Sequence, residues 1–309
     1  MPYAALPPVD RPTLRALADA RWAAMLEHKP EIEAAVSLQR HLMGRVMDLT
    51  EILGAGRVPR LSLPPKYLTA KLAAGIPALT REPIQIPVDT IRPTLVGLVR
   101  SLAEGGGGEA TADIRSAIEE GRIDAGALLT LALRREQGAL RAAATRAGLG
   151  HDLLWLVADL AVGPFAHALL QSVFGHAGEG SPVRTALDAW PRGYCPLCGS
   201  WPAFIELLGT TRVLRCAFCA AAWQVNAGSC LYCNKSGGNL QALEPEASRP
   251  GRVVETCTEC RGYTKVLPAD APLPFPLLAL ADLDSMDLDL AAMQRGCARP
   301  AIKQFGPRR

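Results

Sequence analysis

This chain of 309 residues has few aromatic residues and no large excess of positive or negative charge. Aromatics make up 5% of the sequence, and 33 basic residues nearly balance 30 acidic ones. This balance argues against a dedicated nucleic-acid binder, which usually carries a clustered basic excess. Hydrophobic residues reach 49% and are mostly Ala and Leu, which favours packed helices over a large β-sandwich and excludes disorder of the whole chain.

Signals for export and for membrane insertion are also lacking. Residues 1–21 contain no basic region followed by an apolar stretch of signal-peptide length, so export is not expected. The longest apolar stretch, residues 153–170, is interrupted by Asp159, Pro164 and His167 and falls short of a membrane span. It predicts a buried core helix. A cytoplasmic protein is therefore expected, and its thiols are kept reduced.

Cysteine is absent before Cys195, and the same part of the chain has helical periodicity. Residues 1–185 are predicted to form an all-α domain, with residues 176–182 as a linker. Residues 60–93 are Pro-rich and predicted to be irregular apart from one short helix. The predicted helices cover residues 13–29, 31–53, 67–74, 94–103, 112–120, 124–146 and 152–174, and a further helix is expected at 277–295.

Eight of the nine cysteines occur as four C-x-x-C pairs. A C-x-x-C turn can direct two thiolates at one ion, and a hairpin can return a second pair to complete a tetrahedron. The intervals between pairs are 17, 10 and 23 residues, which group the pairs into two metal sites. The predicted ligands are Cys195, Cys198, Cys216 and Cys219 at the first site, and Cys230, Cys233, Cys257 and Cys260 at the second.

The flanks of these pairs indicate a tandem repeat of one β-rich unit. Residues 212–225 align with residues 252–266, each as strand, cysteine pair, aromatic residue and second strand. Gly199 suits the turn after its pair, and Asn234 tolerates it, whereas Ala220 and Arg261 predict distorted turns. The predicted strands cover residues 201–208, 211–215, 222–226, 252–255 and 262–266.

Other chemistries fit these cysteines less well. Disulfides need an oxidising compartment, and thioredoxin-like catalysis needs a C-x-x-C at the start of a helix, whereas these flanks predict strands and turns. Four thiolates serve zinc or iron, and spacing alone favours zinc. The aromatic residues around the pairs are expected to pack about the metal centres, and the remaining Cys297 is expected to be a packed or free thiol.

Four segments resemble the formate dehydrogenase accessory protein FdhE family. They are PRGYCPLCGSWP (residues 191–202), LRCAFCAAAW (214–223), CLYC (230–233) and ETCTECRGYTK (255–265). The resemblance implies a cytoplasmic assembly factor, not an enzyme, that binds the catalytic subunit of respiratory formate dehydrogenases before its export. It also implies two iron sites of the rubredoxin type, with the eight paired cysteines as ligands and zinc as the alternative metal.

The combined expectation is a multidomain α+β protein. An all-α N-terminal helical domain (1–185) precedes two small β-rich rubredoxin-like or zinc-ribbon-like metal modules (186–226 and 227–270). A Pro-rich linker and C-terminal helix follow (271–309). Two other functions stay open: a rubredoxin-like electron carrier and a zinc-ribbon nucleic-acid binder. The charge disfavours the second, since residues 190–270 hold eight basic and six acidic side chains.

Overall fold

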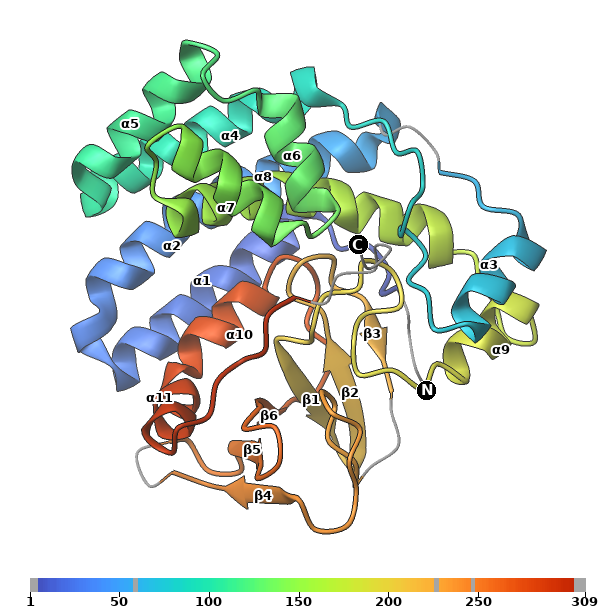
Figure 1. Ribbon diagram of the computed structural model, residues 1–309. Helices are drawn as coiled ribbons and strands as arrows, with labels where there is room; N and C mark the ends of the chain where they lie inside the picture. The colour runs from blue at the N-terminus through green and yellow to red at the C-terminus, as the bar shows by residue number, and fades with distance from the viewer. Residues whose placement is uncertain (1–4, 58–60, 225–227, 246–247, 303–309) are drawn as a thin grey trace. The chain divides into compact units, whose positions relative to one another are not determined.

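The structure is a computed structural model that describes residues 5–57, 61–224, 228–245 and 248–302. The chain forms two compact units, each built from segments distant in the sequence (Figure 1). The helical unit comprises Val9–Leu61 and Arg81–Leu169. The sheet unit comprises Met1–Pro8, Ser62–Thr80 and Leu170–Arg309. The domain boundaries expected after residues 185, 226 and 270 stay predictions.

The helical unit contains seven of the α-helices seen in the described residues. They are α1 (Arg11–His28), α2 (Glu33–Ile52), α4 (Val88–Leu102), α5 (Gly108–Glu119), α6 (Ala125–Leu133), α7 (Gln137–Arg146) and most of α8 (His151–Phe174). Short helical turns occur at η1 (Pro30–Ile32), η2 (Leu53–Arg57) and η3 (Ala103–Gly107). Asp10 caps α1 by accepting a hydrogen bond from the backbone N–H of Thr13 (3.0 Å), and Pro12 lies in the first turn, where its missing N–H costs nothing.

Helix α8 is the one described helix that is long and apolar enough to cross a membrane by length and composition. Most of its apolar side chains are buried, among them Val157, Ala161 and Phe165, each fully inaccessible. Burial of this kind is expected for the core helix of a folded unit. The helix continues through Pro164.

Two helical predictions were wrong in their bounds. Residues 124–146 form two helices, because Arg135 adopts a left-handed conformation (φ 59°) between them. Helix α4 begins at Val88 rather than after Pro93. Its buried stripe of Ile91, Leu95, Leu98 and Leu102 outweighs the one backbone hydrogen bond that the proline removes.

The sheet unit holds the strands and the remaining helices. The strands are β1 (Phe204–Leu208), β2 (Thr211–Arg215), β3 (Ala222–Trp223), β4 (Leu240–Leu243), β5 (Val253–Cys257) and β6 (Tyr263–Pro268). The helices are α3 (Pro65–Ala73), α9 (Pro182–Asp188), α10 (Leu278–Asp284) and α11 (Met286–Gln294), with the end of α8. Strand β4 and helix α9 were not predicted, and α10 and α11 replace the single helix expected at 277–295. Of the strand expected at 222–226, residues 225 and 226 lie outside the described residues.

The predicted repeat is present as two three-stranded ribbons in one sheet. The strand order is β3-β2-β1-β6-β5-β4. Strands β1, β2 and β3 pair antiparallel, and so do β4, β5 and β6, whereas β1 and β6 run parallel and join the two ribbons. Each cysteine pair adjoins a strand of its own ribbon, and Cys257 is the last residue of β5. The expected α+β fold, with a helical N-terminal region, a β-rich cysteine region and C-terminal helices, is confirmed.

Two buried charged side chains of this sheet bind the backbone of the C-terminal segment at Leu273. Arg215 on β2 and Glu206 on β1 form an ion pair with almost no exposed surface. The backbone N–H of Leu273 donates to Glu206 (2.9 Å), and its carbonyl accepts from Arg215 (2.6 Å). These bonds offset part of the desolvation of both charged groups, which is costly without such partners.

Candidate metal centres

Two groups of four cysteines bring their sulfurs together. The first joins Cys195, Cys198, Cys216 and Cys219, and the second joins Cys230, Cys233, Cys257 and Cys260. Within each group all four sulfurs lie within 4.8 Å of one another. The grouping is the one that the spacing predicts. Each group could hold a metal ion.

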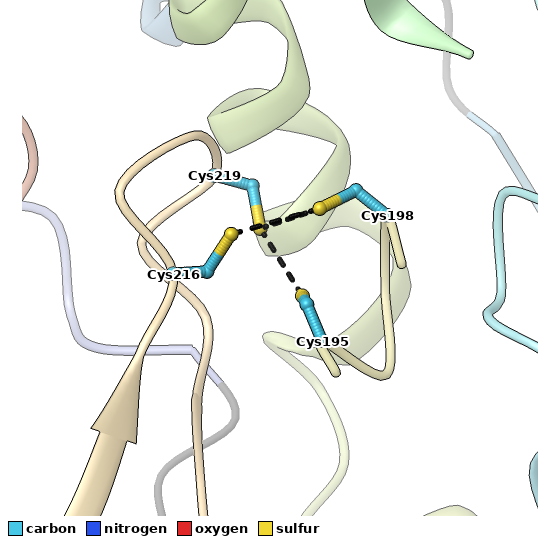
Figure 2. A group of neighbouring side chains, drawn as sticks. All are labelled: Cys195, Cys198, Cys216 and Cys219. Carbon is cyan, nitrogen blue, oxygen red and sulfur yellow. Dashed lines mark hydrogen bonds between the residues drawn. The ribbon is translucent and has the colours of Figure 1, made fainter. Parts of the chain in front are cut away.

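In the first group the four sulfurs point toward a common centre (Figure 2). The Sγ atoms of Cys195 and Cys219 are 3.6 Å apart, as are those of Cys198 and Cys216. In the second group the distances are 3.6 Å for Cys230–Cys260 and 3.8 Å for Cys233–Cys257. A tetrahedron with metal–sulfur bonds of about 2.3 Å has edges of about 3.8 Å, so both groups have the size of a tetrahedral thiolate site. All nine cysteines are free thiols.

The four turns that carry the cysteines share one backbone geometry. In each, the N–H of the residue after the second cysteine donates to the carbonyl of the first, at 3.0 Å for Gly199, 2.8 Å for Ala220, 2.9 Å for Asn234 and 3.0 Å for Arg261. These four residues all have a positive φ, of 81°, 63°, 60° and 58° in the same order. The expectation that Ala220 and Arg261 distort their turns was wrong, because both residues accept the left-handed conformation.

The two groups differ in their access to solvent. All four cysteines of the first group are buried. In the second group Cys230 and Cys257 are buried, Cys233 is half-buried and Cys260 is exposed. Solvent therefore reaches one edge of the second group, whereas the first group is enclosed by protein.

Burial also sets the proton affinity of the thiols. It raises the pKa of Cys195 and Cys219 well above the usual value for a thiol. At Cys257 burial acts in the same direction, but the backbone N–H groups of Cys260 and Glu259 favour the thiolate and bring its pKa down to about 7. A cation held at the centre of either group would supply the charge that stabilises four thiolates together.

A loop from another part of the chain covers the first group. The backbone N–H groups of Ala78 and Leu79 donate to the carbonyls of Pro196 (2.8 Å) and Leu197 (3.0 Å), which lie inside the first C-x-x-C turn. The hydroxyl of Tyr194 donates to the carbonyl of Gly75 (2.8 Å). Sequence reasoning missed this loop, because it lies in the Pro-rich segment predicted to be irregular.

Aromatic side chains link the turns of the two groups. The rings of Tyr194 and Trp201 meet edge to face with centroids 5.8 Å apart, and Trp201 meets Tyr232 at 5.0 Å. Tyr232 lies between Cys230 and Cys233, and its hydroxyl donates to the carbonyl of Tyr263 (2.7 Å). Aromatic packing around the cysteine turns is thus confirmed. Cys297 is buried and belongs to neither group, as expected for a packing residue.

Comparisons with known proteins relate this chain to FdhE proteins. No protein-family model matches the chain. It is 35% identical over 147 residues to Protein FdhE of Escherichia coli O127:H6. The matched stretch covers 46% of this chain and 47% of that protein. It is 31% identical over 128 residues to a Protein FdhE homolog of Haemophilus ducreyi, with coverage of 40% and 41%. The chain thus spans about half the length of the curated relatives it matches.

The similarity in fold covers more of the chain than the similarity in sequence. The crystal structure of the FdhE protein from Pseudomonas aeruginosa matches this fold with a TM-score of 0.56 and 24% sequence identity. The match covers 95% of this chain and 97% of the Pseudomonas protein. At this identity the match shows the fold. The resemblance to the FdhE family is therefore confirmed: this chain is similar to FdhE proteins in sequence over about half of its length and in fold over nearly all of it.

Proposed function

We propose that this chain is an accessory protein in the assembly of formate dehydrogenase and is not itself an enzyme. In this proposal it acts in the cytoplasm and binds the catalytic subunit of a respiratory formate dehydrogenase before that subunit is exported. The observation that carries the proposal is the pair of four-cysteine groups set in a fold shared with an FdhE protein.

The proposed metal ligands are the eight paired cysteines: Cys195, Cys198, Cys216, Cys219, Cys230, Cys233, Cys257 and Cys260. The donor set and the sulfur spacing fit iron or zinc, and we propose iron at both sites, as in rubredoxin. A ferric ion held by four thiolates would supply one-electron redox chemistry. The chain's own part is to hold the sulfurs in place through the four turns and to exclude water from the first site.

Retention of the catalytic subunit tests the proposed partner directly. Immobilised protein, prepared without oxygen and under reducing conditions, is expected to retain the formate dehydrogenase catalytic subunit from solution. A matched column carrying the Cys230→Ser, Cys257→Ser variant should retain less, because the second site is the one that reaches the surface. Failure of the unaltered protein to retain the subunit would count against the proposal.

The metal is identified by colour and elemental analysis. Protein purified without oxygen and then oxidised is expected to be red, through charge transfer from thiolate to ferric iron, and to contain two iron ions per chain. Stoichiometric zinc without iron in such material would exclude the rubredoxin-type assignment. Much less than one metal ion per chain would exclude the sites themselves.

A second function, simple electron transfer, is favoured by the exposure of Cys260. A thiolate ligand at the surface shortens the path between the metal and a redox partner. This function requires reversible reduction and rapid electron exchange with a physiological donor. Stopped-flow reduction of the iron-loaded protein distinguishes electron transfer from the assembly role. Slow electron exchange with every donor tested would exclude electron transfer and support the assembly role.

A further inference from the structure

A groove in the helical unit lies between α2 and α4 and is lined by basic side chains. Its volume is about 540 Å³, and its charged lining comes from Arg45 on α2 and from Asp89, Arg92 and Arg100 on α4. Pro93 and Val96 contribute its apolar part. Three guanidinium groups against one carboxylate leave the groove with an excess of positive charge.

The arginines of this groove are not neutralised by the protein. Throughout the part of the chain that the structure describes, no carboxylate forms an ion pair with Arg45, Arg92 or Arg100. The neighbouring groove between α1 and α2 differs, because its Arg11 and Arg15 are paired with Asp48 and Asp19. Three guanidinium groups without a carboxylate partner give this groove a positive potential, so a bound anion would be stabilised there.

Arg45 is held in place on the groove. Its Nε donates to the hydroxyl of Ser101 (2.9 Å), and its guanidinium lies against the backbone of α4 at Gly97. A Cβ atom at Gly97 would lie 2.6 Å from Nη1 of Arg45, so any other residue there would displace the arginine. Glycine inside a helix costs about 1 kcal/mol relative to alanine, and here it makes room for a charged group.

We propose that this groove binds an acidic segment of a partner polypeptide. Arg92 and Arg100 are eight residues apart on α4, which corresponds to about 12 Å along the helix axis. An extended peptide advances about 3.3 Å per residue and turns alternate side chains to the same face, so carboxylates four residues apart can meet both arginines, and one between them can meet Arg45. A single phosphate is too small to reach both ends.

The chain's own acidic segment does not fill this role. In α10 and α11, Asp282 and Asp289 are paired with Lys265 and Arg299, and Asp284 is paired with Arg252. Helices α10 and α11 of a second copy therefore offer no comparable free acidic stretch, and we take the occupant to be an acidic segment of a different protein. The inference uses no property of the cysteine groups and is independent of the proposed function.

Binding of a labelled peptide of alternating Glu and Ala to the full chain tests the proposal. Fluorescence anisotropy should show saturable binding at low salt that weakens at physiological ionic strength, with no binding of the matching Gln–Ala peptide. The Arg92→Glu, Arg100→Glu variant should raise the Kd by more than about tenfold. Its control is Arg115→Glu, Arg141→Glu, which makes the same charge change at exposed positions on α5 and α7 and should leave the Kd within about twofold.

Gly97→Ala adds a test at constant net charge. It should leave the helical signal intact and still weaken peptide binding, because only the position of Arg45 changes. Equal loss of binding in both charge-reversal variants, tighter binding of inorganic phosphate than of the peptide, or unchanged binding in Gly97→Ala would each overturn the proposal. Loss confined to the groove variants would support it.

Discussion

At the scale of single residues, the position after each C-x-x-C pair fixes the backbone geometry of the cysteine turn. Three of these four positions hold a side chain in the left-handed region, namely Ala220, Asn234 and Arg261. Arg261 has an added role, since its guanidinium donates to the backbone carbonyl of Arg295, just after α11. The turn thus tolerates several residues, provided that the backbone can reach a positive φ.

Substitutions at Asn234 isolate the backbone effect, because its side chain is exposed. Asn234→Gly should change the free energy of unfolding by less than about 0.5 kcal/mol, since glycine adopts positive φ freely. Asn234→Val should lower it by about 1–2 kcal/mol and weaken metal binding at the second site, because a β-branched residue is strained there. Denaturant titration and chelator competition measure the two effects. Equal stability of the two variants would contradict the role assigned to φ.

Gly193 is required by a close approach of two backbone segments. A Cβ atom there would lie 2.1 Å from the carbonyl oxygen of Leu231, inside the third cysteine turn. Gly193→Ala should therefore destabilise the sheet unit by about 1–3 kcal/mol and disturb the second site. Gly138→Ala, on the exposed face of α7 with open space around it, is the matched control and should be neutral or slightly stabilising. Thermal melts of both variants measure the effect, and equal melting temperatures would contradict the role assigned to Gly193.

At the scale of elements, the two ribbons share a fold but differ in their surroundings. The loop at Ala78 and Leu79 closes the first site, whereas Cys260 leaves the second site open at one edge. Chelators reach a metal ion through exposed ligands. The second site is therefore the one expected to exchange its metal.

Metal removal should be biphasic in protein that carries both ions. Excess chelator is expected to remove the ion of the second site first and that of the first site much more slowly. Iodoacetamide added between the two phases should label peptides that contain Cys257 and Cys260 before the peptide that contains Cys195 and Cys198. Mass spectrometry reads out the order of labelling. Simultaneous labelling of both groups would show that burial does not control exchange.

Lys265 on β6 carries much of the attachment of the C-terminal helices. Its side chain has no exposed surface and contacts Asp282 (2.6 Å) and Asp289 (2.8 Å). Lys265→Met should lower the free energy of unfolding by about 2–3 kcal/mol, because Asp282 and Asp289 lose a buried counterion and keep Arg299 as their one positively charged partner among the described residues. The matched control is Lys235→Met, which removes an exposed pair with Glu259 and should leave the free energy of unfolding almost unchanged, because solvent screens that pair.

The local sequence pattern was sufficient to predict the cysteine groups and most of the strands. The spacing of the cysteine pairs predicted both groups, and the strand character of the stretches around them predicted five of the six described strands. Strand β4 was missed because its sequence, LQAL, pairs only with β5 and has no fully buried side chain. The break at Arg135 was missed because a distant contact accompanies it: the arginine pairs with Asp159 and lies over the ring of Trp155 (4.8 Å).

At the scale of the whole molecule, the two units depend differently on metal. All eight paired cysteines belong to the sheet unit, and ions bound at the proposed sites would contribute to the folding free energy of its small ribbons. The helical unit has its own core, with Trp22, Leu95, Leu129 and Phe165 among its buried residues. Loss of metal should therefore unfold one unit and leave the other folded.

Residues 62–80 provide the sharpest test of this division. They precede the cysteines by more than a hundred residues, within the segment 1–185 predicted from the sequence as one helical domain, yet they belong to the sheet unit and cover the first site. In protein stripped of metal, hydrogen exchange should show lost protection at α3 and at the amides of Ala78 and Leu79. Amides of α2 and α4, on either side in the sequence, should keep theirs. Retained protection across residues 62–80 would instead support the domain boundary predicted at residue 185, because this loop would then fold with the helices without help from the metal centre.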